Sequence, residues 1–353
     1  LEHGRTGAKV MHIDCDDIEN LFCISFQTLP KDSSGTAHIL EHTVLCGSKK
    51  YPVKDPFFSM TRRSLNTFMN AMTGADFTCY PAASQVKQDF YNLLEVYLDA
   101  VFFPNLKKLS FLQEGHRLEF QKPTDVDSPL VYKGIVFNEM KGAMSAPEAR
   151  LWNSLMEQLT PDLPYAYNSG GDPKEIPKLT YEELKNFHKT FYHPSRALFF
   201  FYGNMPLKNH LDCLEKNALK SFEKVPPLPP ISKQNRFPSP KTCLTSYPLD
   251  VKKSDKKTYC AFTWLTTSIQ NQEEVLALSV LDSILMETDA SPLKEGLLKS
   301  GLCTQADGYI DLEMSEIPYT IICQGCNEKD QSALKTIIFK TLTELASKDF
   351  SPS

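Results

Sequence analysis

The 353-residue sequence lacks the features that mark several broad classes of protein. It has no apolar run of about 18 or more residues, so no transmembrane helix is predicted. It has no excess of positive charge, since 38 Lys and Arg accompany 43 Asp and Glu and the formal net charge is −5. That balance argues against binding to nucleic acid by bulk charge. We therefore predict neither a nucleic-acid nor a membrane partner for this chain.

The sequence also lacks a second Cys-x-x-Cys motif to accompany Cys323-Gln-Gly-Cys326, and a zinc ribbon requires two such pairs. Most of the ten cysteines lie in apolar runs, as Cys23 and Cys260 do, which is typical of reduced, buried thiols. We predict a reducing compartment, which means the cytoplasm for a bacterial protein and the mitochondrial matrix or plastid stroma for a eukaryotic one. The chain begins at Leu1 without a methionine, and we expect it to be a fragment.

The most informative motif is His38-Ile-Leu-Glu41-His42. Two histidines four residues apart lie on one face of a helix, where both imidazoles can reach the same metal ion. Glu41 precedes the second histidine and lies beside that metal, so it can take a proton from a water that the metal activates. The order H-x-x-E-H is that of the inverzincin metallopeptidases. The motif therefore predicts zinc peptidase chemistry.

The pattern of apolar residues predicts an α+β fold built from two similar units. Strands are expected at 8–15, 20–28, 66–73, 77–83 and 196–202, and helices at 36–47, 55–58, 84–103, 131–145, 148–160, 180–192 and 207–222. Six prolines between 226 and 240 predict a linker, after which strands at 257–265, 301–311 and 317–323 and helices at 273–286 and 329–347 follow. We predict a catalytic domain at 1–223, a proline-rich linker at 224–245 and a second, non-catalytic and truncated domain at 246–353.

Two histidines leave a zinc site one protein ligand short, because the fourth position holds water. A carboxylate is the usual completion, and the candidates are Glu95, Glu114, Glu119, Glu139 and Glu148. Glu139 is attractive because it lies in a mostly apolar helical segment, where an unpaired carboxylate is costly; an exposed helix face remains the alternative. Among the other histidines, we expect His116 and His193 to be structural hydrogen-bond partners, and His188 and His210 to lie on exposed helix faces.

Seven segments carry a resemblance to a known family, and they are 38–58, 65–73, 89–94, 97–104, 133–142, 169–173 and 191–194. In these segments the sequence resembles the presequence proteases, a branch of the pitrilysin/insulinase family of inverted zincins. The resemblance covers essentially the whole chain and is densest from 35 to 203. It implies α+β domains with mostly antiparallel sheets and packed helices, which in full-length members enclose a chamber that admits unfolded peptides.

The resemblance also implies roles for individual residues. It places the third zinc ligand at Glu139, in the segment Phe137-Asn-Glu-Met-Lys-Gly142, and a pocket beside the scissile bond at Phe57 and Phe58. It matches Asn70 and Ala71 to an edge strand that binds the substrate backbone. For these four residues the ordinary alternatives are core packing for the phenylalanines and turn chemistry for Asn70. Full-length members are about three times as long, and their C-terminal half supplies an arginine and a tyrosine to the site.

We therefore expect a zinc-dependent endopeptidase that acts on unstructured peptides, with one zinc ion per chain held by His38, His42 and Glu139. Glu41 is the expected general base. The alternative is an inert fragment or subunit that binds zinc and peptides but needs the missing C-terminal half for activity. A structural zinc protein is a third reading, disfavoured because such sites are usually closed and rich in cysteine.

Overall fold

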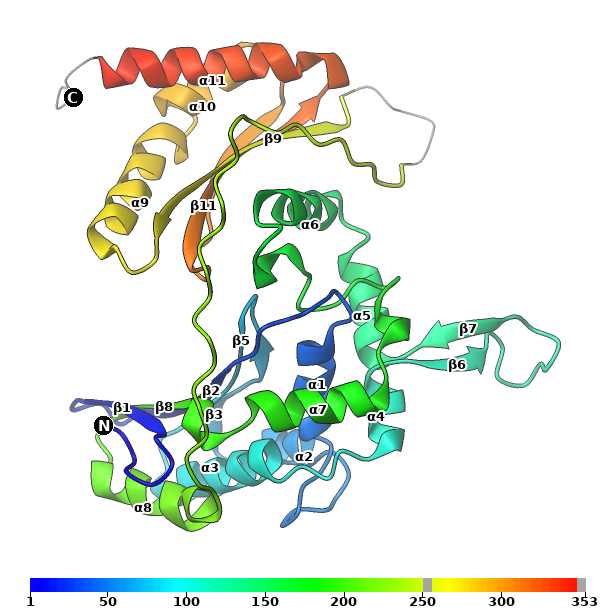
Figure 1. Cartoon of the computed structure of the whole chain (residues 1–353), viewed down its shortest axis with the longest axis vertical. Coiled ribbons are helices and arrows are strands. Elements are labelled where there is room, and N and C mark those ends of the chain that lie inside the picture. Colours follow the sequence, from blue (N-terminus) through cyan, green and yellow to red (C-terminus); the bar gives the residue numbers. More distant parts are fainter. Residues whose placement is uncertain (250–255, 348–353) are drawn as a thin grey trace. The chain divides into compact units, whose positions relative to one another are not determined.

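The computed structural model describes residues 1–249 and 256–347 (Figure 1). By their contacts these residues form two units, one of residues 1–146 with 167–230 and the other of residues 147–166 with 231–249 and 256–347. The segment Pro147–Ala166 thus groups with the second unit, although the sequence pattern places it within 1–223. Residues 226–240, all of them described, contain neither helix nor strand.

The first unit contains a mixed sheet, a separate hairpin and a set of helices. Its strands are β1 (Lys9–Asp14), β2 (Asn20–Gln27), β3 (Asn66–Met69), β4 (Met72–Thr73), β5 (Phe77–Ser84), β6 (Arg117–Phe120), β7 (Leu130–Lys133) and β8 (Ala197–Gly203). Its α-helices are α1 (Thr36–Val44), α2 (Pro56–Arg63), α3 (Lys87–Phe102), α4 (Lys108–Glu114), α5 (Ile135–Ala143), α7 (Tyr181–Phe191) and α8 (Leu207–Asn217).

The main sheet has the strand order β1-β8-β2-β5-β3, and β4 also pairs with β5. Only the β1–β8 pair is parallel, with Lys9 opposite Leu198. Along β2 buried and half-buried residues alternate strictly, because successive side chains of a strand point to opposite faces. Phe22, Ile24 and Phe26 therefore share the face that helices cover, and they belong to one core with residues of α1, α3 and α7.

The expected helix at 131–145 is wrong in its first turn. Residues 130–133 form β7, which pairs antiparallel with β6, and the helix α5 begins only at Ile135. The two strands form a hairpin that extends away from the rest of its unit (Figure 1). Exposure alternates along Leu130–Lys133, as in a strand. A segment of four residues is too short for its sequence to distinguish a strand from a helix, so the pairing with β6 decides the structure.

The second unit has a three-stranded antiparallel sheet in the order β10-β11-β9, covered by helices. Its elements are α6 (Pro147–Leu159), β9 (Thr258–Ser268), α9 (Gln272–Met286), α10 (Pro292–Lys299), β10 (Gln305–Ile310), β11 (Glu316–Cys326) and α11 (Gln331–Ala346). Its core includes four buried thiols, those of Cys260, Cys303, Cys323 and Cys326. The α+β class predicted from the sequence is confirmed in both units. Within the described ranges, no helix combines the length and apolarity needed to span a membrane.

Candidate metal centre

Helix α1 carries the H-x-x-E-H motif and begins where the backbone lies close to a neighbouring loop. Gly35 precedes the helix with φ at +69°, a conformation that favours glycine. A Cβ at this position would lie 2.7 Å from the carbonyl oxygen of Gly170. Ile39, Leu40 and Val44 face the core and fix the rotation of the helix. That rotation leaves His38 and His42 on a face that is only partly covered.

The histidines meet a carboxylate from α5. His38 Nε2 lies 3.7 Å and His42 Nε2 4.0 Å from Glu139 Oε2. Ligand atoms of these three residues all lie within 4.8 Å of one another. A tetrahedral zinc ion with bonds of about 2.0–2.2 Å places its ligands roughly 3.3–3.6 Å apart. The distances from Glu139 Oε2 to the two Nε2 atoms are slightly longer than this, and two imidazoles and a carboxylate are a donor set that fits a zinc ion with one position left open.

Close backbone packing places Glu139. Gly134, at the start of α5, lies so near the end of α4 that an added Cβ would be 1.9 Å from the carbonyl oxygen of Gly115. Val136 and Phe137 are buried and hold α5 against the core. The Glu139 side chain is 53% exposed, so it faces the open side of the histidine pair.

Both histidines use their second ring nitrogen for a hydrogen bond within the protein. His38 Nδ1 donates to the carbonyl oxygen of Gly170 at 3.0 Å, and His42 Nδ1 donates to Glu114 Oε2 at 3.2 Å. Burial acts to lower the pKa of His42, but the hydrogen bond to Glu114 and the charges of the nearby glutamates outweigh burial and raise that pKa. In both rings the nitrogen that faces Glu139 is Nε2.

Glu41 lies on the same helix and is only 6% exposed. Thr73 Oγ1, from strand β4, donates a hydrogen bond of 2.6 Å to Glu41 Oε2. Because helix α1 contacts β4, this bond fixes the carboxylate in one orientation. No pattern in the sequence predicts the Thr73 contact, because it depends on the pairing of β4 with β5.

The structure distributes the other candidate glutamates elsewhere. Glu95 accepts hydrogen bonds from Lys50 and Tyr51, and Glu119 forms ion pairs with Arg117 and Lys133. Glu148 accepts a hydrogen bond from Tyr259 within the second unit. Glu114 also lies outside the group formed by His38, His42 and Glu139, but it accepts a hydrogen bond from His42 Nδ1.

The residues expected to bind substrate lie on α2 and beside β3 and β4. Phe57 packs against the core and lies 6.1 Å from the Tyr97 ring, whereas Phe58 is 63% exposed. Asn70 and Ala71 connect β3 to β4, and the backbone N–H of Asn70 donates to the Pro81 carbonyl oxygen. Ala71 is half-buried against the core.

The histidines outside the motif have structural contacts. His116 Nε2 lies 2.9 Å from the Leu179 carbonyl oxygen, and His193 accepts a hydrogen bond from the Ser195 amide, as predicted for both. The expectation for the other two is wrong. His210 is fully buried, stacked on Phe201, and His188 is half-buried with a hydrogen bond to the Val101 carbonyl.

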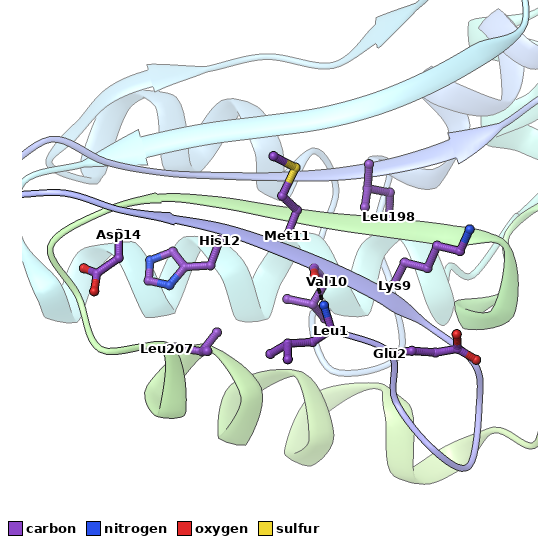
Figure 2. Close-up of a pocket in the computed structure, with 9 residues that line it drawn as sticks. All are labelled: Leu1, Glu2, Lys9, Val10, Met11, His12, Asp14, Leu198 and Leu207. Carbon is purple, nitrogen blue, oxygen red and sulfur yellow. Dashed lines mark hydrogen bonds between the residues drawn. The ribbon is translucent and has the colours of Figure 1, made fainter. Parts of the chain in front are cut away.

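A surface hollow of about 790 Å³ lies along the edge strand β1 (Figure 2). Figure 2 shows His12 and Asp14 of β1 on one side of it, with Leu207 of α8 below. Its lining comes from β1, β8, α8 and the N-terminal residues, whereas the metal group comes from α1 and α5.

Comparison with known proteins identifies the family. A model of the insulinase family, peptidase family M16, matches residues 29–129, which include the whole H-x-x-E-H motif, and a model of the peptidase M16 inactive domain matches residues 178–353. The chain belongs to peptidase family M16. Within this family it is a homologue of the presequence proteases.

Relatives of this M16 chain are longer than it is. The mitochondrial presequence protease of Xenopus tropicalis is 47% identical over 98% of this chain, which covers 34% of that protein. Presequence protease 1 of Arabidopsis thaliana, chloroplastic/mitochondrial, is 42% identical over 99% of this chain and 33% of that protein. The chain thus spans about a third of the length of these relatives. A protease structure from Helicobacter pylori has the same fold, with a TM-score of 0.72 and 18% identity over 99% of this chain and 80% of that one.

Proposed function

We propose that this chain is the zinc-binding part of a zinc-dependent endopeptidase that degrades unstructured peptides, including peptides of the targeting type. The observation that carries the proposal is the convergence of His38, His42 and Glu139, with Glu41 held beside them by Thr73. This donor set fits one zinc ion per chain. The open fourth position is what distinguishes a catalytic zinc site from a structural one.

In this proposal each side chain has a separate task. A bound zinc ion would supply Lewis acidity, which acidifies a water and polarises the scissile carbonyl. Glu41 takes the proton from the attacking water and delivers it to the leaving nitrogen. Thr73 holds the Glu41 carboxylate through the 2.6 Å hydrogen bond, so the base does not need to reorient during the reaction.

We further propose that peptides bind in extended form beside β3 and β4. Strand β3 ends the sheet order, so one of its edges is open to an added strand. Asn70 and Ala71 would contact the peptide backbone there, and Phe57 with the exposed Phe58 would contact a side chain next to the scissile bond. The neighbouring Phe68 and Met72 are 44% and 42% exposed, which gives this edge an apolar surface.

The domain organisation that we propose is catalytic at 1–223, linker at 224–245 and non-catalytic at 246–353. The match of the M16 inactive domain to residues 178–353 supports a second part without its own metal motif. From the names of the mitochondrial and chloroplastic relatives we propose an organellar, reducing location. Unfolded peptides and the C-terminal half of a longer chain are the proposed partners.

The second candidate is an inert fragment or subunit that binds zinc and peptides. It is favoured by the length comparison, because relatives contain about twice as much additional chain. Zinc content and cleavage of a quenched, unstructured peptide separate the two candidates when measured for this chain and for a full-length homologous chain together. Zinc in both and cleavage only in the longer chain would place the missing function in the absent half.

The general base is tested by Glu41→Gln in the longer, active chain. The variant should keep one zinc per chain and lose about 10²- to 10⁴-fold in turnover, because the amide cannot accept the proton. Glu95→Gln, which removes a carboxylate outside the metal group, is the matched control and should cleave normally. Full turnover by the Glu41 variant would eliminate Glu41 as the base, and absence of zinc from the wild-type protein would eliminate the metal site.

A further inference from the structure

Glu114 is a buried carboxylate that the proposed reaction does not use. It is the last residue of α4 and is 5% exposed. A carboxylate taken out of water is costly unless hydrogen bonds replace its hydration. Its position in the fold therefore requires partners that donate to it.

Three donors surround the Glu114 carboxylate. His42 Nδ1 lies 3.2 Å from Oε2, while Gln113 Nε2 at 2.9 Å and Cys46 Sγ at 3.6 Å donate to Oε1. Both carboxylate oxygens are thus engaged, and Oε2 is directed at the imidazole.

This contact decides which nitrogen of His42 is free. Because a carboxylate accepts and does not donate, Nδ1 carries the ring proton and the lone pair is on Nε2. Nε2 is the atom that lies 4.0 Å from Glu139 Oε2. In His38 the neutral carbonyl of Gly170 has the same effect on the ring proton. The two histidines therefore share a tautomer, but the group that accepts the hydrogen bond from Nδ1 is neutral for His38 and charged for His42.

The position of Glu114 is coupled to that of Glu139. Gly115 follows Glu114 directly, and its carbonyl oxygen packs against Gly134 at the start of α5. A displacement of the end of α4 would therefore move the helix that carries Glu139. The contact between Gly115 and Gly134 therefore positions two carboxylates. Glu139 faces the Nε2 atoms of both histidines, and Glu114 accepts the hydrogen bond from His42 Nδ1.

We propose that Glu114 is the positioning residue of the zinc site: it orients His42, fixes its tautomer and increases its strength as a ligand, without contacting the metal. This inference rests on the proposed zinc function. Carboxylates behind zinc-bound histidines increase ligand basicity, and their loss typically weakens metal binding by about 10- to 100-fold.

The test is the zinc affinity of wild-type protein, Glu114→Ala and Glu114→Gln, measured by competition with a chelator of known affinity. The alanine variant should bind zinc about 10- to 100-fold more weakly and still reach one zinc per chain at saturation. The glutamine side chain has the shape of glutamate and keeps an acceptor oxygen, so this variant should lose less zinc affinity than the alanine variant. Glu95→Gln is the control and should bind zinc as the wild type does.

A second readout reports on orientation alone. In metal-free protein labelled with ¹⁵N-histidine, at a pH that keeps the ring neutral, the His42 signal should show the proton on Nδ1 in the wild type and a shift of that population toward Nε2 in the alanine variant. A merely structural role of Glu114 would lower thermal stability without changing the tautomer. If the alanine variant does not fold, the isosteric glutamine variant decides the result by its affinity.

The outcomes distinguish this inference from the proposed function. No zinc in the wild type overturns the proposed function. Tight zinc binding that is unchanged in both Glu114 variants, with the tautomer also unchanged, overturns the positioning role alone. Failure of a folded Glu114 variant to reach one zinc per chain at saturation would make Glu114 a ligand and would also overturn it.

Discussion

Protonation of His210 should destabilise the first unit as the pH falls. The ring is fully buried, stacked on Phe201 at 4.2 Å and in contact with the Tyr91 hydroxyl at 3.1 Å. Burial, reinforced by the nearby His12, lowers the pKa of His210 from 6.5 to about 4. Since the folded-state pKa is below that of the unfolded chain, the unfolded chain binds more protons between these values. Stability is therefore complete above pH 6.5 and decreases toward pH 4.

The magnitude follows from the two pKa values. At pH 5 the unfolded imidazole is mostly protonated and the folded one mostly neutral, which removes about 1–2 kcal/mol relative to pH 8 once some solvent screening is included. The measurement is amide hydrogen exchange in β8, which gives an opening free energy for this unit, at pH 8 and at pH 5. It compares wild-type protein with His210→Asn.

The asparagine variant is expected to be less stable at both pH values because it removes packing against Phe201. Its decrease between pH 8 and pH 5 should nevertheless be smaller than that of the wild type by about 1–2 kcal/mol. His188 and His193, whose pKa values are also lowered, contribute equally to both proteins and cancel. An identical decrease in the two proteins would refute the assignment to His210.

Three further substitutions test the packing that holds the site. Gly134→Ala places a Cβ 1.9 Å from the Gly115 oxygen, so urea unfolding should show a loss of about 1–3 kcal/mol, with weaker zinc binding as α5 shifts; unchanged zinc affinity would contradict the close-packing argument. Thr180→Ala removes the side-chain oxygen that accepts from the Glu183 backbone amide in a capping box, and it should cost about 1 kcal/mol in urea unfolding, whereas Thr180→Ser should cost little. Phe199→Ala should cost about 3–5 kcal/mol by urea unfolding because Phe199 is fully buried, and Leu198→Ala, on the exposed face, should cost far less.

Local geometry made part of this protein predictable. The spacing of His38 and His42 determines that they share a helix face, because a helix turns once in 3.6 residues. The capping box at Thr180 and Glu183 depends only on hydrogen bonds within one turn, and it is present in the structure. The β-branched and aromatic residues at 20–28 likewise predict a strand, and β2 occupies Asn20–Gln27.

Non-local pairing made the rest unpredictable. Residues 130–133 become a strand because β6, separated from them by a loop, supplies the hydrogen bonds. His210 is buried because α8 packs with α3, a contact between segments more than a hundred residues apart. Neither outcome can be predicted from the local sequence. For residues 130–133 the reason is that a short apolar segment fits a strand and a helix equally well.

The sequence by itself determined that His38, Glu41 and His42 lie together on one helix, and it determined the α+β class, since each rests on spacing within one element or on the order of elements. The tertiary structure decided which glutamate meets the histidines. It also decided which groups stand behind them: Glu114 behind His42, the Gly170 carbonyl behind His38 and Thr73 at Glu41. These contacts join segments that lie from about thirty to over a hundred residues apart, and only the packing of α1 against α4, α7 and β4 brings them together.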